Sequence, residues 1–124
     1  MSKALLIMAH GSRAEAANDE VRALAEQVAR DHRQYAAVTA CFLELAAPSL
    51  LEALQQLEHQ PVETVYVYPL FFNSGRHVVR DIPAQVEEAR RRFPHLTIEL
   101  LDYFGSAGGL AALVGQHAGR QTGQ

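Results

Sequence analysis

Two histidines and a glutamate are the residues of this 124-residue chain best suited to chemistry near neutral pH. His10 directly follows a short apolar run, and the next residue, Gly11, permits a tight turn or a close approach to a ligand. His77 lies in a long stretch over residues 69–80, and Glu44 is flanked by apolar residues. Two imidazoles and a carboxylate together are ligands that suit a divalent transition metal.

Each of these features also has a purely structural interpretation. His10 could cap a helix or hydrogen-bond a loop, the arginines near His77 could simply be solvated, and Glu44 could be an exposed residue near a helix start. No two of the three show a tight ligand spacing such as His-x-x-x-His. The fold must therefore bring them together if they act as one site.

Four short stretches have the composition of β-strands. Residues 3–9 are almost uniformly apolar, which favours a strand buried on both faces. Residues 62–68 alternate in polarity and are rich in β-branched and aromatic side chains. Residues 38–43 and 96–101 complete the set of four expected strands.

Apolar residues at helical spacing predict a helix after each strand. We expect these helices over about residues 15–33, from Pro48-Ser49 onward, from Asp81 to Pro94, and after Gly108-Gly109. Asp81 is expected to cap the third helix, with Pro83 in its first turn. The segment before it, residues 69–80, is then a loop that is longer than usual, and such loops often carry function.

Strict alternation of strands and helices predicts an α/β fold, a four-stranded parallel sheet with helices on both faces, in the flavodoxin-like strand order 2-1-3-4. Ligands of such sheets bind beyond the carboxyl ends of the strands. His10, Glu44 and the loop that carries His77 follow three of these ends. We expect one domain over residues 1–118 and a flexible tail over residues 119–124, which is small and polar.

The composition argues against several functions. Eleven Lys and Arg against fourteen Asp and Glu give a formal charge of −3, whereas nucleic-acid binders usually have a basic excess. No apolar stretch is long enough to span a membrane. The one cysteine, Cys41, allows no internal disulfide and is expected to be a small buried hydrophobe, which fits a cytoplasmic protein. Phosphate-binding loops, dinucleotide fingerprints and nucleophile elbows are absent.

The stretches that carry these residues resemble the class II chelatases, and among them the short sirohydrochlorin cobaltochelatases, which are CbiX-like and related to the SirB ferrochelatases. The matching segments read LLIMAHGSR at residues 5–13, FLELAAPSL at 42–50, and PLFF followed by GRHVVRDIP within 69–83. The resemblance implies a chelatase fold and a lyase that inserts a divalent metal into sirohydrochlorin. It also implies a homodimer, and a metal that is a substrate, with no permanently bound cofactor.

The resemblance further implies that His10 and His77 are paired active-site residues with Glu44 as their acidic partner, and that all three bind the metal. We expect His77 to be the base or the metal-delivering residue, and Glu44 to guide the metal or accept a proton. The arginines suit the substrate carboxylates. The expected substrate-binding residues are Ser12, Arg13, Asn73, Ser74, Gly75, Arg76 and Arg80.

Three questions stay open at this point. Cobalt is the expected metal, but iron and nickel also accept histidine and carboxylate ligands, so cobalamin, sirohaem and nickel tetrapyrrole pathways all remain. A carrier of metal or tetrapyrrole would use the same pocket without turnover. A histidine phosphatase is disfavoured, because Ala9 stands where those enzymes need an arginine before the histidine.

Overall fold

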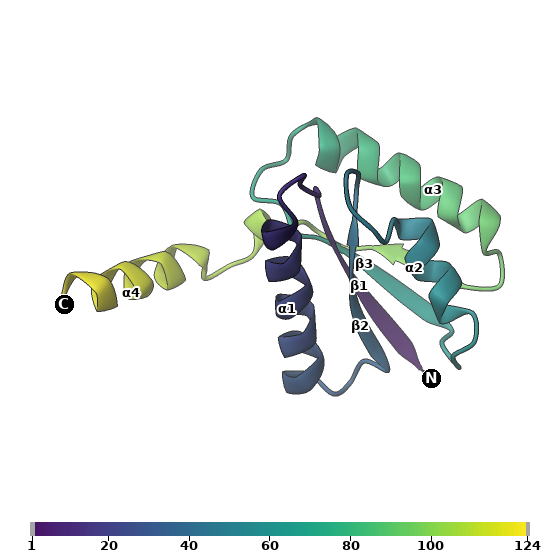
Figure 1. Ribbon diagram of the computed structural model, residues 1–124, viewed down its shortest axis with the longest axis horizontal. Helices are drawn as coiled ribbons and strands as arrows, with labels where there is room; N and C mark the ends of the chain where they lie inside the picture. The colour runs from purple at the N-terminus through teal and green to yellow at the C-terminus, as the bar shows by residue number, and fades with distance from the viewer. Residues whose placement is uncertain (1, 124) are drawn as a thin grey trace.

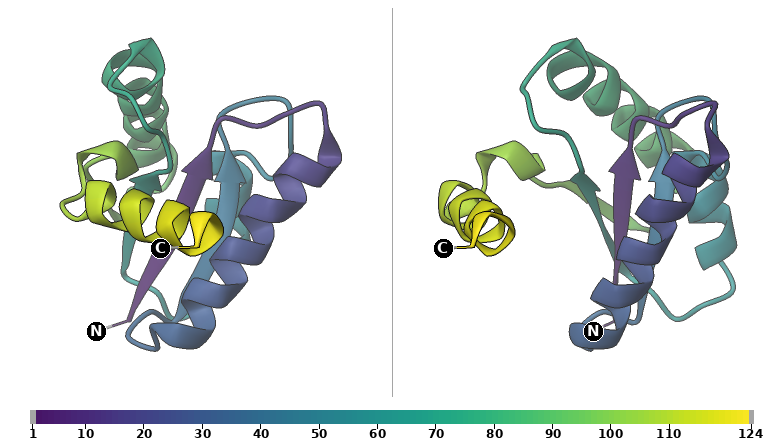
Figure 2. Two further views of the ribbon diagram at one scale, coloured as in Figure 1. Left: turned by 90° about the vertical axis from the view of Figure 1, so that its left-hand side faces the viewer. Right: turned by 60° about the vertical axis from the view of Figure 1, so that its left-hand side comes forward.

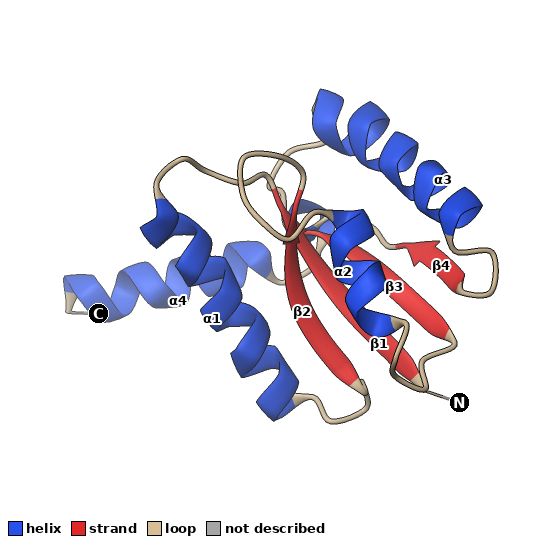
Figure 3. Ribbon diagram, turned by 45° about the vertical axis from the view of Figure 1, so that its right-hand side comes forward, coloured by secondary structure: helices blue, strands red, loops and turns tan. Residues whose placement is uncertain are grey.

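The sheet is built from four parallel strands, seen in the computed structural model of the chain, which describes residues 2–123. Their order, β2-β1-β3-β4, confirms the expected arrangement (Figure 3). The strands are β1 (Lys3–Ala9), β2 (Ala37–Phe42), β3 (Thr64–Pro69) and β4 (Thr97–Leu100).

β1 lies between β2 and β3, and both of these strands end beside the last residues of β1. Every residue of β1 after Lys3 is buried, as expected of an apolar strand covered on both faces. Ala9 pairs with Phe42 of β2, and Met8 pairs with Pro69 of β3. The residues that follow these three strands therefore emerge at one edge of the sheet.

Three helices cover the two faces of the sheet (Figure 1). α2 (Leu50–Leu57) and α3 (Ile82–Arg92) lie on one face, and α1 (Glu15–Asp31) lies on the other. Cys41 is fully buried in the core beneath α2 and α3, and this burial raises the pKa of its thiol to about 12. The thiol thus stays protonated, and the prediction of a small buried hydrophobe is confirmed.

The start of α2 is fixed by a capping box. The Ser49 hydroxyl accepts the Glu52 backbone N–H at 3.2 Å, and the Glu52 carboxylate accepts the Ser49 backbone N–H at 2.8 Å. Pro48 precedes the helix, so the expected opening at Pro48-Ser49 is confirmed with Ser49 as the cap.

Replacing Ser49 by alanine is expected to lower the free energy of unfolding by about 1 kcal/mol, because an N-terminal amide of α2 loses its acceptor. The midpoint of urea denaturation would measure the change. Ser74→Ala is a matched control, since Ser74 is exposed and forms no side-chain hydrogen bond within residues 2–123. Equal midpoints for the two variants would show that the box contributes nothing.

The prediction of a loop over residues 69–80 is wrong for the second half of this segment. Residues His77–Asp81 form a π-helical turn that runs directly into α3, and the Ile82 N–H is donated to the His77 carbonyl. Asp81 is consequently not a cap: its backbone is helical, with φ −72° and ψ −43°, and its carboxylate receives no backbone N–H of α3. The side chain is occupied by His77 instead, as described below.

The last helix, α4 (Leu110–Thr122), differs from the expectation in two ways. It continues past Gly119 to Thr122 and ends at Gly123, whose φ of +81° forms a left-handed cap. The expected boundary at residue 118 therefore falls inside a helix, and Gln124 lies outside the described residues. α4 also leaves the body of the domain instead of covering the sheet (Figure 1).

No helix within residues 2–123 is long and apolar enough to cross a membrane.

Candidate active site

The loops after β1 and β2 are joined by backbone hydrogen bonds that extend the sheet. The Leu43 N–H is donated to the Ala9 carbonyl at 2.9 Å, and the Glu44 N–H to the His10 carbonyl at 3.0 Å. Gly11 has a φ of +97°, and a Cβ built on it would lie 1.7 Å from the Glu44 carbonyl oxygen. Only glycine fits this position, and its absence of a side chain lets the two loops touch.

His10 is held between two acceptors. Its Nε2 lies 3.0 Å from Glu44 Oε2, and its Nδ1 lies 3.0 Å from the Gly11 carbonyl oxygen. A ring with a proton on each nitrogen donates to both neighbours. Because the side chains of His10 and Glu44 are 41% and 54% exposed, the pair is open to a substrate. The arrangement suits a histidine that accepts a proton and shares the resulting charge with Glu44.

His77 is oriented from within its own helical turn. Its Nδ1–H is donated to Asp81 Oδ2 at 2.8 Å, which leaves the lone pair of Nε2 free in the neutral ring. Such a histidine–carboxylate contact fixes both the tautomer and the ring orientation of a metal ligand. Asp81 is a site residue that the sequence analysis missed. The signal was the spacing of four between His77 and Asp81, which has meaning only on a helix.

The two histidines lie against each other. Their ring centroids are 4.7 Å apart at an interplanar angle of 62°. Phe71 packs beside both, with its ring centroid 6.4 Å from His10 and 6.3 Å from His77. The predicted meeting of His10, Glu44 and His77 at the sheet edge is thus present, with Phe71 as an apolar wall that sequence spacing did not indicate.

The three expected metal ligands do not form a preassembled metal site. Two of them, His10 and Glu44, pair with each other, and His77 pairs with Asp81. Within residues 2–123, no three His, Cys, Asp or Glu side chains converge as a ready metal site. Glu44 faces Nε2 of His10, while His77 is paired with Asp81. His77 Nε2 is the donor atom that these pairings leave available, which suits a metal that is bound briefly and passed on.

Ser12 forms hydrogen bonds with residues close to it in the sequence. Its hydroxyl accepts the Ala14 N–H at 3.0 Å, and its backbone exchanges two hydrogen bonds with the amide of Asn18. Asn18 is 2% exposed and is the one buried polar residue in the described chain. It positions the loop after β1, a role that no pattern in the sequence indicated.

The other expected substrate-binding residues lie on exposed segments around the histidines. Arg13, Arg76 and Arg80 are exposed, and none forms an ion pair within residues 2–123. A hollow of about 390 Å³ beside His77 is lined by residues between Leu70 and Val78. The exposed residues Asn73, Ser74 and Gly75 belong to the same loop, and their role in binding stays a prediction.

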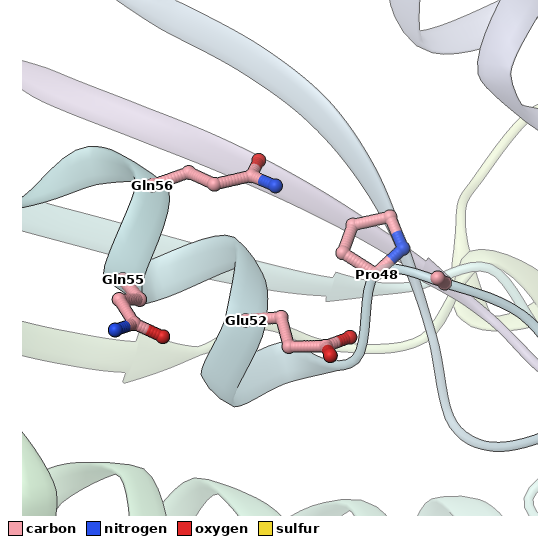
Figure 4. A pocket seen from close by; sticks show the side chains of 5 residues that line it. Pro48, Glu52, Gln55 and Gln56 are labelled. Carbon is pink, nitrogen blue, oxygen red and sulfur yellow. The ribbon is translucent and has the colours of Figure 1, made fainter.

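Another hollow, of about 460 Å³, lies beside α2 (Figure 4). It is lined by Ala47, Pro48, Glu52, Gln55 and Gln56. The lining contains no histidine and no cation, so nothing in it matches the chemistry of the His10–His77 site.

The parallel sheet and the paired histidines at its carboxyl edge define an α/β protein of the chelatase-like type. Residues 4–121 match the family model described as CbiX, and the chain belongs to the CbiX family. This confirms the resemblance to CbiX-like proteins that the sequence motifs indicated.

Relatives and solved structures agree with this assignment. The chain is 38% identical to the sirohydrochlorin cobaltochelatase of Sulfurisphaera tokodaii over 69% of each chain. It is 26% identical to the sirohydrochlorin ferrochelatase of Priestia megaterium over 82% of this chain but 38% of the relative. SirB from Bacillus subtilis with Fe³⁺ superimposes with a TM-score of 0.85 at 25% identity, over 97% of this chain and 47% of SirB.

A solved protein of similar length shares the same fold. The putative cobalamin biosynthesis CbiX protein from Marinobacter aquaeolei superimposes with a TM-score of 0.80, and the match covers 97% of both chains at 24% identity.

Proposed function

We propose that this protein is a sirohydrochlorin chelatase, a lyase that inserts a divalent metal into the tetrapyrrole. The observation that carries the proposal is the pair of contacting histidines, each held by its own carboxylate, at the open edge of a CbiX-family sheet. The metal is a substrate, and no resident cofactor is required. A cytoplasmic location belongs to the proposal, because a free and buried Cys41 suits a reducing compartment.

Metal insertion needs two operations that the two histidines divide between them. The metal must lose water and be presented to the ring, and two pyrrole N–H protons must leave. His77 is the metal-delivering residue, because its Nδ1 faces Asp81 and its Nε2 is left to bind a metal. His10 accepts a proton, and the Glu44 carboxylate at 3.0 Å stabilises the cation that forms. His10 and Glu44 are also proposed to bind the metal.

The substrate is held by its carboxylates. Arg13, Arg76 and Arg80 flank the histidines from the loops after β1 and β3, and their guanidinium groups suit bidentate contact with a carboxylate. Ser12, Asn73, Ser74 and Gly75 are proposed to complete the substrate contacts. No nucleic acid and no membrane takes part in this function.

Cobalt is the proposed metal, with iron and nickel as alternatives. The support is the name cobaltochelatase carried by relatives at 38% identity in Sulfurisphaera tokodaii and 33% in Sulfolobus acidocaldarius. A homodimer is proposed because the matched SirB chain is long enough to hold a second unit of this size.

Anaerobic insertion into sirohydrochlorin, followed by visible absorbance with sub-stoichiometric protein, tests the proposal. Co²⁺, Fe²⁺ and Ni²⁺ are compared in parallel, each against a reaction without protein. Multiple turnovers with one metal support a chelatase and identify its substrate. Binding of sirohydrochlorin at fixed stoichiometry, with no rate above background for any metal, would favour the carrier instead.

Asp81→Asn is expected to slow cobalt insertion by about 10- to 100-fold, since an amide can either donate or accept and no longer fixes the His77 tautomer. The Kd for Co²⁺ should rise with the loss of rate, which a change in tetrapyrrole binding alone would not cause. Asp102→Asn is the control, because Asp102 is exposed and forms no ion pair within the described chain. An unchanged rate and Kd in Asp81→Asn would remove Asp81 from the site.

A further inference from the structure

The first turns of α1 carry a row of polar side chains on one face. Asn18, Asp19 and Arg22 lie three, four and seven residues after Glu15, which is the spacing of neighbours along a helix. Both views of Figure 2 show the loops after β1 and β2 at the same end of the sheet as the start of α1. This row of side chains is therefore close to both of the loops that carry the site.

Asn18 holds the loop after β1. Its amide nitrogen donates to the Ser12 carbonyl at 2.8 Å, and its amide oxygen accepts the Ser12 N–H at 2.9 Å. The same nitrogen lies 3.4 Å from Glu15 Oε1, which also accepts a hydrogen bond from Arg22 Nη1 at 2.7 Å. The hydrogen bonds from Arg22 and Asn18 hold the pKa of Glu15 below its usual range, so a charged carboxylate joins these two side chains.

Arg22 holds the loop after β2. Its Nη2 donates to the Ala47 carbonyl at 2.9 Å, and its guanidinium carbon lies 5.2 Å from the ring centroid of the fully buried Phe42. Its Nη1 donates to Glu15 at 2.7 Å and to Asp19 at 2.8 Å. The planar guanidinium group thus uses one nitrogen for α1 and the other for the loop after β2.

Within residues 2–123, the segment Leu45–Ala47, directly after Glu44, makes a single hydrogen bond, which joins the Ala47 carbonyl to Arg22. Leu45 has a φ of +69°, a conformation that leucine rarely adopts, and it is 53% exposed. Neither the local preference of Leu45 nor its burial therefore stabilises the path of the chain after Glu44. The contact with Arg22 is left to hold this segment against α1.

We propose that Arg22 is a positioning residue for metal insertion, and that it acts through Glu44. By holding Ala47, Arg22 keeps the loop after β2 in place, so that the Glu44 carboxylate stays 3.0 Å from Nε2 of His10. Asn18 has the matching role on the loop after β1, and one face of α1 thus fixes both members of the His10–Glu44 pair. The inference rests on the proposed function, in which Glu44 stabilises the cation that forms when His10 accepts a proton.

A double-mutant cycle on the full chain tests whether Arg22 acts through Glu44. Arg22→Ala should slow metal insertion by about fivefold in the otherwise unmodified protein, but by less than about 1.5-fold when Glu44→Gln is already present. The Kd for sirohydrochlorin, measured without metal, should stay the same, because Arg22 is not proposed to contact the substrate. Equal fold losses in the two backgrounds, or a higher Kd, would overturn the positioning role.

Two further variants separate this role from the stability of α1. Arg30→Ala is the matched control, because Arg30 is exposed on the same helix and forms no ion pair within the described part of the chain. It should leave the insertion rate unchanged. Arg22→Lys keeps a positive charge beside Glu15 and Asp19 but loses the fork of two nitrogens, so it should also slow insertion. Unchanged insertion in both Arg22 variants would overturn the inference and leave the proposed function intact.

Backbone dynamics give a readout that needs no turnover. The ¹⁵N order parameters of Leu45–Ala47 should fall in Arg22→Ala and stay unchanged in Arg30→Ala, because only Arg22 holds this segment. Unchanged order parameters in Arg22→Ala would overturn the positioning role even if insertion slows. An unmodified chain that inserts no metal would instead overturn the proposed function, and the positioning role with it.

Discussion

Replacing His77 by alanine is expected to lower the initial rate of Co²⁺ insertion into sirohydrochlorin by about 10²-fold or more. The variant loses Nε2, the donor atom that the pairing of His77 with Asp81 leaves free beside His10. Anaerobic absorbance at sub-stoichiometric protein measures the rate. Because the His77 side chain is 43% exposed and contacts no buried core residue through hydrogen bonds, the denaturation midpoint should change little.

His32→Ala is the control for that experiment. His32 is exposed at the end of α1, and only its backbone N–H forms a hydrogen bond within the described residues. The His32→Ala substitution removes an imidazole that lies away from the site. Equal rates for His77→Ala and the unmodified protein would contradict the assignment of metal delivery to His77.

Replacing Gly11 by alanine is expected to damage both the fold and the site. The new Cβ would overlap the Glu44 carbonyl, and alanine disfavours a φ of +97°. Relief requires the loop with Glu44 to move, which separates Glu44 from His10. We expect the free energy of unfolding to fall by about 3 kcal/mol, from backbone strain and overpacking together. Urea denaturation and the insertion rate measure the two effects.

Gly108→Ala separates this steric effect from the general consequences of removing a glycine. A Cβ on Gly108 meets no atom within 4 Å, and its φ lies outside the left-handed region. Stability and insertion rate should both stay close to those of the unmodified chain. A Gly11→Ala variant that behaves like Gly108→Ala would show that the loops after β1 and β2 need no close approach.

The sheet was predictable because its strands carry strong local signals. The uniformly apolar run of β1 identified the central strand, and the alternation of β3 matches side chains that are buried on one face and half-buried on the other. His10 and Glu44 come after the carboxyl ends of β1 and β2, so parallel pairing of these strands predicts that both residues lie at one edge of the sheet. The meeting of these residues followed from topology, not from their spacing in sequence.

Asp81 and α4 escaped prediction for physical reasons of different kinds. The His77–Asp81 contact depends on a π-helical turn, and polar residues near a loop give no apolar periodicity to reveal one. Asn18 acts through two hydrogen bonds to a turn six residues away, which no helical stripe records. The stripe of α4 did predict a helix, but periodicity says nothing about whether a helix packs on its own sheet.

The π-helical turn sets the direction of His77 independently of the packing of α3. Ile82, Val86 and Ala89 fix the rotational phase of α3 against the sheet, because all three are buried. The wider turn places one extra residue between that phase and His77. If the same five residues were wound as an ordinary α-helix, His77 would lie roughly 100° farther round the helix axis, because a π-helical turn takes about one residue more than an α-helical turn. The direction of the His77 side chain thus depends on the width of this turn as well as on the number of residues in it.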